Sequence, residues 1–347
     1  MSSTIKTAIL GGGGFVGMEI YRILKKQVNV SIEFVSSESL VDQPVEKYYR
    51  MFKNKNKQLK FKPISQLEDG YDVIFSCLPT GVLPIYIDRI KSKSKVIFNV
   101  SGDFRLQDQY QLEKYYPQTL NTNTYLESQY YIPEFHELDK ESKIINLPGC
   151  MAVASIYSLY PLVKNNLIEN KIVIDAKTGS SGGGKKSTEH PAERAHNLRP
   201  HKVHGHRHKP EICHVFESMF GIALDLQFST YSLDLPRGIM VTSYTQLKED
   251  ISEIDVKKSY FRDYKGMPFI DYIKDTRGGR FNPMIKSVAG TNRVEVAAYV
   301  DGRNCVSICT LDNLIKGAAG QAIQAFNQYF GYPEFQSLNF HNEGMWP

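Results

Sequence analysis

Cys150 stands where a cysteine can act as a nucleophile. It lies in the stretch INLPGCMAVAS (residues 145–155), in which a short apolar run meets Pro148-Gly149 and a helical segment of small residues follows. A thiol in the first turn of a helix lies near the positive end of the helix dipole and near backbone N–H groups without helical partners, and both favour the thiolate. A free cysteine is more often a small buried hydrophobic residue. The position favours the nucleophile over that alternative.

Three histidines form a second group with chemical potential. His204, His206 and His208 alternate along the chain, so in a strand their side chains would share one face. This spacing raises a zinc site as a rival, but cysteine and carboxylate partners at ligand spacing are missing, so no metal is predicted. The favoured interpretation is a histidine that takes a proton from Cys150 and returns it to an oxyanion.

A loop rich in glycine and hydroxyl groups precedes these histidines. The strand-like run IVIDAKTG (172–179) opens into Ser180-Ser181, three glycines, and the cations Lys185 and Lys186. Such a loop can wrap an anion, and a plain linker is the alternative. Three arginines are candidates to hold a carboxylate or phosphate: Arg199, Arg207 and Arg237.

The N-terminal segment has the pattern of a dinucleotide-binding unit. A β-like run, IKTAIL (5–10), leads through a glycine turn into a segment with helical spacing of apolar residues. This arrangement lets backbone N–H groups approach a pyrophosphate at a helix N-terminus. The predicted cofactor contacts in the turn are Gly11, Gly12, Gly13, Gly14, Phe15, Val16 and Gly17.

The end of the next predicted strand, VSIEFV (30–35), bears on the choice of cofactor. It is followed by Ser36, Ser37 and Glu38, at the point where this architecture meets the adenosine ribose. An acidic residue there accepts from the 2′-hydroxyl of NAD, whereas two hydroxyl groups suit the 2′-phosphate of NADP. The residues alone leave both cofactors open.

Further elements complete an α/β chain. The runs 71–79 and 95–104 predict later strands of a parallel sheet, a helix with one apolar face follows Cys150, and residues 311–331 predict a C-terminal helix. We expect an N-terminal Rossmann domain over residues 1–149 and an α+β catalytic, substrate-binding and dimerisation domain over 150–312. Residues 313–347 are expected to return as a helix to the cofactor domain.

Composition excludes several other classes of protein. The 347 residues are 41% hydrophobic and 23% charged, and no apolar run approaches the roughly 18 residues that span a bilayer. No signal-peptide core is visible and five cysteines are too sparse for a disulfide framework, so a cytoplasmic protein without membrane association is expected. The net charge is +5, and the basic stretch KNKNKQLKFK (53–62) carries no nucleic-acid module. Docking of an acidic protein on this stretch stays open.

The assembled motifs resemble the N-acetyl-γ-glutamyl-phosphate reductase family, relatives of aspartate-semialdehyde dehydrogenase, over nearly the whole chain. The matching stretches are GGGGFVG, SCLPTGV, VSGDFRL, LPGCMAVAS, GSSGGGKK, GHRHKPEI, RGIM, AGTNRVEV and DNLIKGAAGQAIQAFN. The resemblance implies an aspartate-semialdehyde dehydrogenase-like fold, NADP(H) as cofactor and a homo-oligomer, dimer or tetramer. It also implies that Cys150 is the nucleophile, that His206 is the acid–base and that Asn313 contacts the cofactor. The implied substrate-binding residues are Ser180, Ser181, Lys185, Arg199, Arg207, Glu211 and Arg237.

Two branches share this pattern. One reduces free N-acetylglutamyl phosphate in arginine synthesis, and the other acts on glutamate or α-aminoadipate attached to a small acidic amino-group carrier protein of the LysW type. The stretches HPAERAHNLRPHKVHGHRH and YKGMPFI and the basic charge balance favour the carrier-dependent branch. Two positions depart from the family pattern, since Glu38 replaces a usual arginine and His201 replaces a common tyrosine. A non-catalytic redox sensor, in which Cys150 is merely oxidisable, is the alternative of another class.

Overall fold

The chain divides into two compact units, each built on its own sheet. The computed structural model describes residues 4–49, 51–52, 58–185, 191–274 and 281–341. Unit 1 contains the described residues up to Pro148 together with Ala318–Leu338, and unit 2 contains Gly149–Gly317 with residues 339–341. The domain boundaries predicted from the sequence fall after residues 149 and 312.

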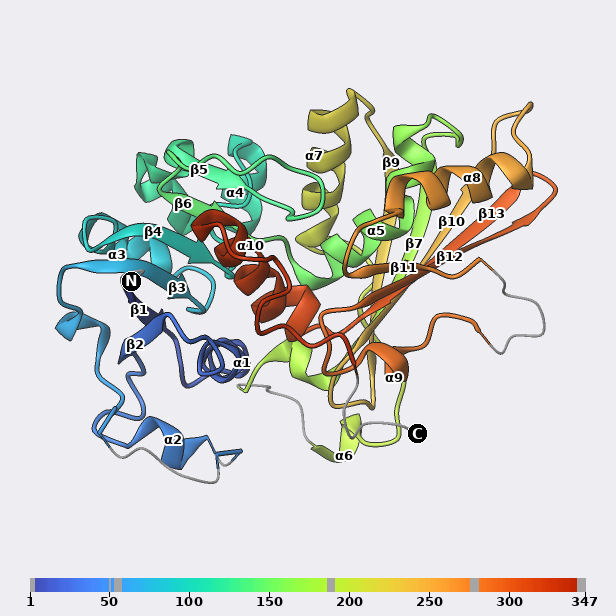
Figure 1. Cartoon of the computed structure of the whole chain (residues 1–347). Helices are drawn as coiled ribbons and strands as arrows, with labels where there is room; N and C mark the ends of the chain where they lie inside the picture. Colours follow the sequence, from blue (N-terminus) through green and yellow to red (C-terminus); the bar gives the residue numbers. More distant parts are fainter. Residues whose placement is uncertain (1–3, 50, 53–57, 186–190, 275–280, 342–347) are drawn as a thin grey trace. The chain divides into compact units, whose positions relative to one another are not determined.

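Unit 1 contains a six-stranded parallel sheet (Figure 1). Its strands lie in the order β2-β1-β3-β4-β6-β5. Their bounds are β1 Ile5–Leu10, β2 Val30–Val35, β3 Tyr71–Ser76, β4 Ser94–Asn99, β5 Ser128–Tyr130 and β6 Ile144–Asn146. The predicted parallel, doubly wound arrangement is confirmed, although β3 and β4 end several residues before the apolar runs that predicted them.

Helices cover both faces of this sheet because side chains alternate along each strand. The helices are α1 Phe15–Leu24, α2 Val45–Tyr48, α3 Leu83–Ile90, α4 Gln109–Tyr115 and α10 Gly320–Phe330, with 3₁₀ turns η1 Ile64–Gln66, η2 Pro117–Asn121 and η3 Asn123–Glu127. Leu83 and Ile87 of α3 join the core cluster that contains Ile74 of β3. On the opposite face, Phe326 of α10 packs against the ring of Phe75 in β3, with ring centroids 5.8 Å apart.

Unit 2 contains a seven-stranded mixed sheet, ordered β11-β12-β13-β10-β7-β9-β8. The strand bounds are β7 Lys171–Gly179, β8 Arg199–Lys202, β9 Asp225–Leu233, β10 Ile239–Gln246, β11 Ile270–Tyr272, β12 Val294–Asp301 and β13 Asn304–Leu311. The pairs β7–β9 and β11–β12 are parallel and the other neighbours are antiparallel. A mixed sheet with helices is the α+β domain expected from the sequence.

The longer helices of unit 2, α5 Cys150–Lys164, α7 His208–Phe220 and α8 Glu253–Tyr264, pack against this sheet (Figure 1). Shorter ones are α6 Pro191–Arg194, α9 Ile285–Val288, the 3₁₀ turn η4 Ser180–Gly183 and the π-helix η6 Ile315–Ala319. The prediction of a single apolar face after Cys150 is wrong, because α5 is buried on every side from Met151 to Val163. The helix packs on β10 and β13 and also touches α7 and α8, so no side remains for solvent.

The C-terminal helix starts later than its sequence pattern predicts. Leu311 is the last residue of β13, and the chain turns before the π-helix and α10 begin. The carboxylate of Asp312 accepts hydrogen bonds from the backbone N–H groups of Leu314 and Ile315, at 2.8 and 2.9 Å. An acidic side chain that caps these N–H groups starts a helix at this point rather than within the strand. Within the described residues, no helix is both long and apolar enough to cross a membrane.

The glycine turn of unit 1 is packed so tightly that one of its glycines has no room for a side chain. A Cβ at Gly17 would lie 2.7 Å from the carbonyl oxygen of Gly11 and 2.7 Å from the Cα of Gly12. Both are backbone atoms of the turn itself, so they cannot rotate away. A Cβ at Gly14 would meet the same Gly11 oxygen at 3.5 Å, which is an ordinary contact.

Gly17→Ala should therefore lower the free energy of unfolding by about 1–3 kcal/mol, the usual cost of overpacking. Alanine is normally the better helix former, so this sign depends on the collision alone. The matched variant Gly14→Ala should cost less than about 1 kcal/mol, because it changes only the residue at the helix N-cap. Urea denaturation of the two variants measures the difference, and equal losses would contradict the packing argument.

Candidate functional site

The thiol of Cys150 lies at the start of α5, as the sequence predicts. Gly149 is the N-cap of this helix and has extended dihedral angles, φ −68° and ψ 146°. A Cβ at Gly149 would lie 2.2 Å from Nε2 of His208. The imidazole of His208 therefore packs directly against the backbone that precedes the thiol, and only glycine fits there.

A second glycine bounds the other side of Cys150. A Cβ at Gly317, in the π-helix, would lie 2.7 Å from the Cβ of Cys150. The backbone N–H of Gly317 donates to the carbonyl oxygen of Asp312 at 2.8 Å, which holds this turn in place. Gly317 is not among the site residues predicted from the sequence, because nothing in the neighbouring residues shows that it contacts Cys150, far away in the chain.

Glu211 holds the backbone beside the thiol. Its residue is fully buried, with 0% of its surface exposed, and its Oε2 accepts a hydrogen bond from the backbone N–H of Gly149 at 2.9 Å. Its Oε1 lies 4.0 Å from Nε2 of His208. The carboxylate of Glu211 is therefore used within the protein at this point, and its predicted contact with the substrate stays a prediction.

The three histidines do not lie in a strand, so their alternation does not place them on one face. Strand β8 ends at Lys202 and α7 begins at His208, and Gly205 between them has φ +69°, which ends the extended run. His204 is exposed, whereas His206 and His208 are buried, with their ring centroids 4.6 Å apart. In the part of the chain that the structure describes, no group of three or more His, Cys, Asp or Glu residues is arranged to hold a metal ion.

His206 is held as a neutral imidazole. Its Nδ1 accepts from the backbone N–H of His208 at 3.1 Å, so in the neutral ring Nε2 carries the proton. Burial, together with the positive charges of His208, Arg207 and Lys202, lowers the pKa of His206 to about 2. In this state His206 can donate a hydrogen bond from Nε2 to an oxyanion.

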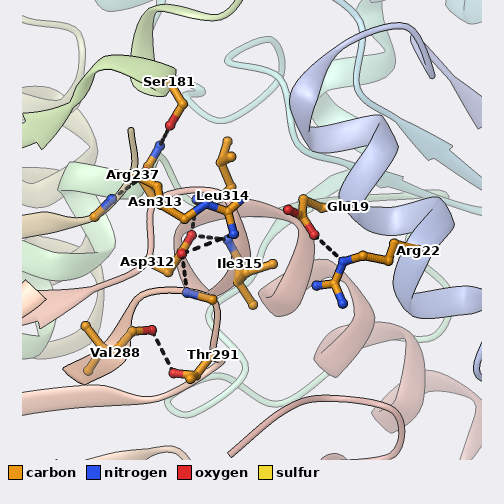
Figure 2. Close-up of polar contacts among 12 residues, drawn as sticks. Glu19, Arg22, Ser181, Arg237, Val288, Thr291, Asp312, Asn313, Leu314 and Ile315 are labelled. Atoms are coloured by element: carbon orange, nitrogen blue, oxygen red, sulfur yellow. Dashed lines mark hydrogen bonds and ion pairs between the residues drawn. The ribbon is translucent and has the colours of Figure 1, made fainter. Parts of the chain in front are cut away.

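The hydroxyl-rich loop after β7 is a built element rather than a plain linker. Ser180 and Ser181 donate their backbone N–H groups to the carbonyl oxygens of Leu235 and Pro236, at 2.8 and 3.2 Å. The amide of Asn313 joins the two loops, because Oδ1 accepts from the backbone N–H of Gly238 at 2.7 Å and Nδ2 donates to Oγ of Ser181 at 3.0 Å (Figure 2). The predicted contact between Asn313 and the cofactor stays a prediction.

Arg237 lies beside this loop and is anchored by a buried acid. Its Nη1 lies 3.4 Å from Oδ2 of Asp312, whose carboxylate also accepts from the backbone of Gly290 at 2.6 Å (Figure 2). Burial raises the pKa of Asp312, and Arg237 and the surrounding backbone N–H groups oppose that shift. The side chain of Arg237 remains 21% exposed, so it is accessible to an anion.

The other predicted anion-binding residues lie at the surface of unit 2. Lys185 and Arg207 are exposed, and Arg199 in β8 is half-buried. Lys186 lies outside the described residues, as do the lysines at 53, 55 and 57. Exposure is compatible with contact to an anionic substrate, and the role of each stays a prediction.

The glycine turn that is predicted to contact a dinucleotide lies between β1 and α1. Oγ of Ser36 accepts from the backbone N–H of Gly11 at 3.0 Å, and the hydroxyl of Tyr49 donates to the carbonyl oxygen of Gly12. A Cβ at Gly13 would lie 2.9 Å from Oγ of Ser37, so a side chain at this position would crowd that serine. The turn precedes α1, where the helix dipole favours a pyrophosphate.

Glu38 lies where the predicted cofactor site would meet the adenosine ribose, and its carboxylate makes a hydrogen bond within the protein. Its Oε1 accepts from the backbone N–H of Ile64 at 2.9 Å, at the start of η1. The backbone N–H groups of Ser36 and Ser37 donate to the carbonyl oxygens of Ile9 and Lys62, at 2.8 and 3.0 Å, so both already have partners within the protein. The half-buried hydroxyl of Ser37 and the neighbouring Lys62 are suited to a 2′-phosphate, whereas the buried hydroxyl of Ser36 accepts from the N–H of Gly11.

Comparisons with known proteins agree with this arrangement. Residues 6–142 match the family model of the semialdehyde dehydrogenase NAD-binding domain, and residues 150–313 match that of the semialdehyde dehydrogenase dimerisation domain. Aspartate semialdehyde dehydrogenase II of Vibrio cholerae, solved with ASA, has a TM-score of 0.72 at 14% identity over 95% of this chain and 99% of its own. At that identity the likeness shows the fold.

Relatives of known name share much more of the sequence. N-acetyl-gamma-glutamyl-phosphate reductase 1 of Lactiplantibacillus plantarum is 46% identical over 99% of this chain and 100% of its own. A putative LysW-L-2-aminoadipate/LysW-L-glutamate phosphate reductase of Caldivirga maquilingensis is 37% identical over 96% of this chain and 98% of its own. The protein of the same name from Nitrosopumilus maritimus is 32% identical over 97% of this chain and 98% of its own. The chain therefore belongs to the N-acetyl-γ-glutamyl-phosphate reductase family, within the semialdehyde dehydrogenases.

Proposed function

We propose that this protein reduces an acyl phosphate to a semialdehyde, with NADPH as the reductant and release of inorganic phosphate. The observation that carries the proposal is the position of Cys150 at the first residue of α5, enclosed by Gly317 and by the Gly149–His208 contact. A thiol fixed at a helix N-terminus is suited to act as a thiolate nucleophile.

The chemistry follows from that thiol. The thiolate of Cys150 attacks the acyl carbon, the bond to the phosphate oxygen breaks, and phosphate leaves with the electron pair, which gives a thioester. A bound NADPH would supply the hydride for the thioester carbon, which leaves a tetrahedral alkoxide attached to Cys150. The alkoxide re-forms the carbonyl as the carbon–sulfur bond breaks with its electron pair on sulfur, so the semialdehyde leaves and the Cys150 thiolate is regenerated.

His206 supports the oxygen on which charge develops. Its neutral ring, with the proton on Nε2, can donate a hydrogen bond to the oxyanion of the tetrahedral states. The acid–base role that the family resemblance implies for His206 stays a prediction. His208 packs against Gly149 and so fixes the backbone beside the thiol.

The first candidate substrate is free N-acetyl-γ-glutamyl phosphate. It is supported by the relative named for that substrate, which is 46% identical to this chain, whereas the two LysW-type relatives are 37% and 32% identical. The sequence motifs favour a carrier-linked substrate, and the LysW-type relatives keep that as the second candidate. In either case Ser181, Lys185 and Arg237 are the groups proposed to hold the phosphate or carboxylate.

We also propose a homo-oligomer that uses the open face of the second sheet. Tyr244 of β10 pairs with Val173 of β7, and both side chains are unusually exposed for large hydrophobic residues, at 44% and 39%. Val306 of β13 pairs with the same Tyr244. Apolar side chains in register across three strands form a surface that a second copy of the chain can cover.

The substrate proposal is tested by comparing the two acyl phosphates as substrates. We expect NADPH oxidation with free N-acetyl-γ-glutamyl phosphate at a kcat/KM at least tenfold above that with the LysW-linked form, and no turnover by Cys150→Ser with either. Serine is a poor nucleophile at neutral pH, so this control assigns the activity to the thiol. Efficient turnover of only the carrier-linked form would reverse the choice.

Alkylation of Cys150 by iodoacetamide separates a reductase from a redox sensor. Acyl-phosphate substrate should protect the thiol of a reductase from alkylation, whereas it should give no protection in a redox sensor.

The two histidines are expected to differ in their kinetic effects. His206→Ala should lower kcat by roughly 10²–10⁴-fold, the usual contribution of a positioned acid–base. His208→Ala should cost less, because His208 acts on the backbone and the residual site keeps its proton donor. Steady-state rates of both variants show which histidine is the acid–base, and a larger loss in His208→Ala would assign that role to His208.

Cofactor preference should respond to the charge of Glu38. The wild-type enzyme is expected to use NADPH with modest discrimination against NADH. Glu38→Gln keeps an acceptor for the N–H of Ile64 and removes like-charge repulsion of about 1 kcal/mol, or about fivefold in kcat/KM for NADPH. Glu38→Arg should raise the preference further through a charge-assisted contact. The ratio of kcat/KM for the two cofactors measures this, and a wild-type enzyme that strongly prefers NADH would contradict it.

A further inference from the structure

Glu211 is a buried carboxylate whose place in the proposed function is not explained by substrate binding. It lies in the first turn of α7 with 0% of its surface exposed. A buried charge is costly unless hydrogen bonds compensate it. The partner at 2.9 Å is the backbone N–H of Gly149, and His208 follows at 4.0 Å.

The hydrogen bond falls on the peptide that carries the thiol. Gly149 is the N-cap of α5 and Cys150 is the first residue of the helix, so holding the N–H of Gly149 holds the entry of the chain into the helix. A hydrogen bond to an ionised acceptor is roughly twice as strong as a neutral one. A carboxylate at a helix N-terminus is also favoured by the helix dipole.

His208 supports the same peptide from the same helix. Its imidazole lies where a side chain at Gly149 would be, with Nε2 2.2 Å from that Cβ position. Residues 208 and 211 are one turn apart on α7, so both side chains project to one side of the helix. Gly149 is therefore held by a hydrogen bond to Glu211 and by a packing contact with His208.

Cys150 also packs closely against the π-helix. A Cβ added at Gly317 would lie 2.7 Å from the Cβ of Cys150, so this contact requires glycine at position 317. A misplacement of a reacting atom by about 1 Å can cost about 10²-fold in rate. The position of the sulfur therefore depends on how firmly Gly149 is held.

We infer that Glu211 is a positioning residue for the nucleophile: its carboxylate fixes the N–H of Gly149 and, with His208, sets the position of the Cys150 thiol. This inference deepens the proposed function and relies on it only for its kinetic readouts. Charged or titratable groups also surround this cluster, namely Lys202 from β8, His206 and Arg207 from the segment before α7, and His214 of α7 itself.

Two substitutions separate the hydrogen bond from the charge and the volume. Glu211→Gln keeps an acceptor for Gly149, whereas Glu211→Met keeps the volume and removes the acceptor. Glu211→Met should lower both kcat and the rate of Cys150 alkylation by iodoacetamide by roughly 10²-fold, with KM for the acyl phosphate and Kd for NADPH unchanged. Glu211→Gln should restore both rates to within about tenfold of the wild type. Glu217→Gln, on the exposed side of the same helix, is the matched control and should change none of these quantities.

The outcomes distinguish positioning from the other roles. A raised KM with unchanged kcat and unchanged alkylation would show direct contact with substrate and overturn the inference. Unchanged alkylation in both Glu211 variants would show that the carboxylate only packs, with the same consequence. If Glu211→Met does not fold, Glu211→Asp replaces it, since the shorter side chain withdraws the acceptor from Gly149 and should lower alkylation likewise. Alkylation does not require turnover, so it tests Glu211 even if the wild-type protein reduces no acyl phosphate.

Discussion

The close packing around Gly149 is the constraint on which the proposed site depends. One peptide carries the N–H that Glu211 binds, the Cα against which His208 packs, and the bond that leads into Cys150. Because the contact with His208 leaves no room for a side chain, the glycine of the Pro-Gly-Cys order is required by packing. As the first residue of α5, Cys150 lies at the positive end of the helix dipole.

Local patterns in the sequence predict much of the fold. The strands β1 and β7 are apolar runs that lead into glycines, β2 is an apolar run that ends at two serines, and the helix that starts at Cys150 follows Pro-Gly. The parallel sheet of unit 1 follows from the same patterns, because strands that alternate with helices pair in parallel. In each of these cases the signal and the structure lie within a few consecutive residues.

The differences between prediction and structure concern features that apolar periodicity does not record. The alternating histidines would share one face in a strand, but the positive φ of Gly205 and the start of α7 at His208 separate them. The carboxylate of Asp312 starts a helix in a run whose periodicity began earlier. Glu211 and Gly317 contact the Gly149–Cys150 segment from far along the chain, and no pattern of spacing records such contacts. Sequence resemblance identifies the family, whereas these side chains explain how its cysteine is placed.

Unit 1 is discontinuous in the chain, and this has a consequence for its synthesis. Phe326 of α10 packs on Phe75, and Asn327 accepts from the side-chain amide of Gln27 at 3.0 Å, so the helix that completes the sheet comes from the C-terminal part of the chain. On the ribosome, the part of the sheet face that α10 covers stays exposed until the whole of unit 2 has been translated. An apolar face exposed for that time is a site for chaperone binding or aggregation. Nascent chains that are released early would then be cleared rather than accumulate as a stable cofactor-binding fragment.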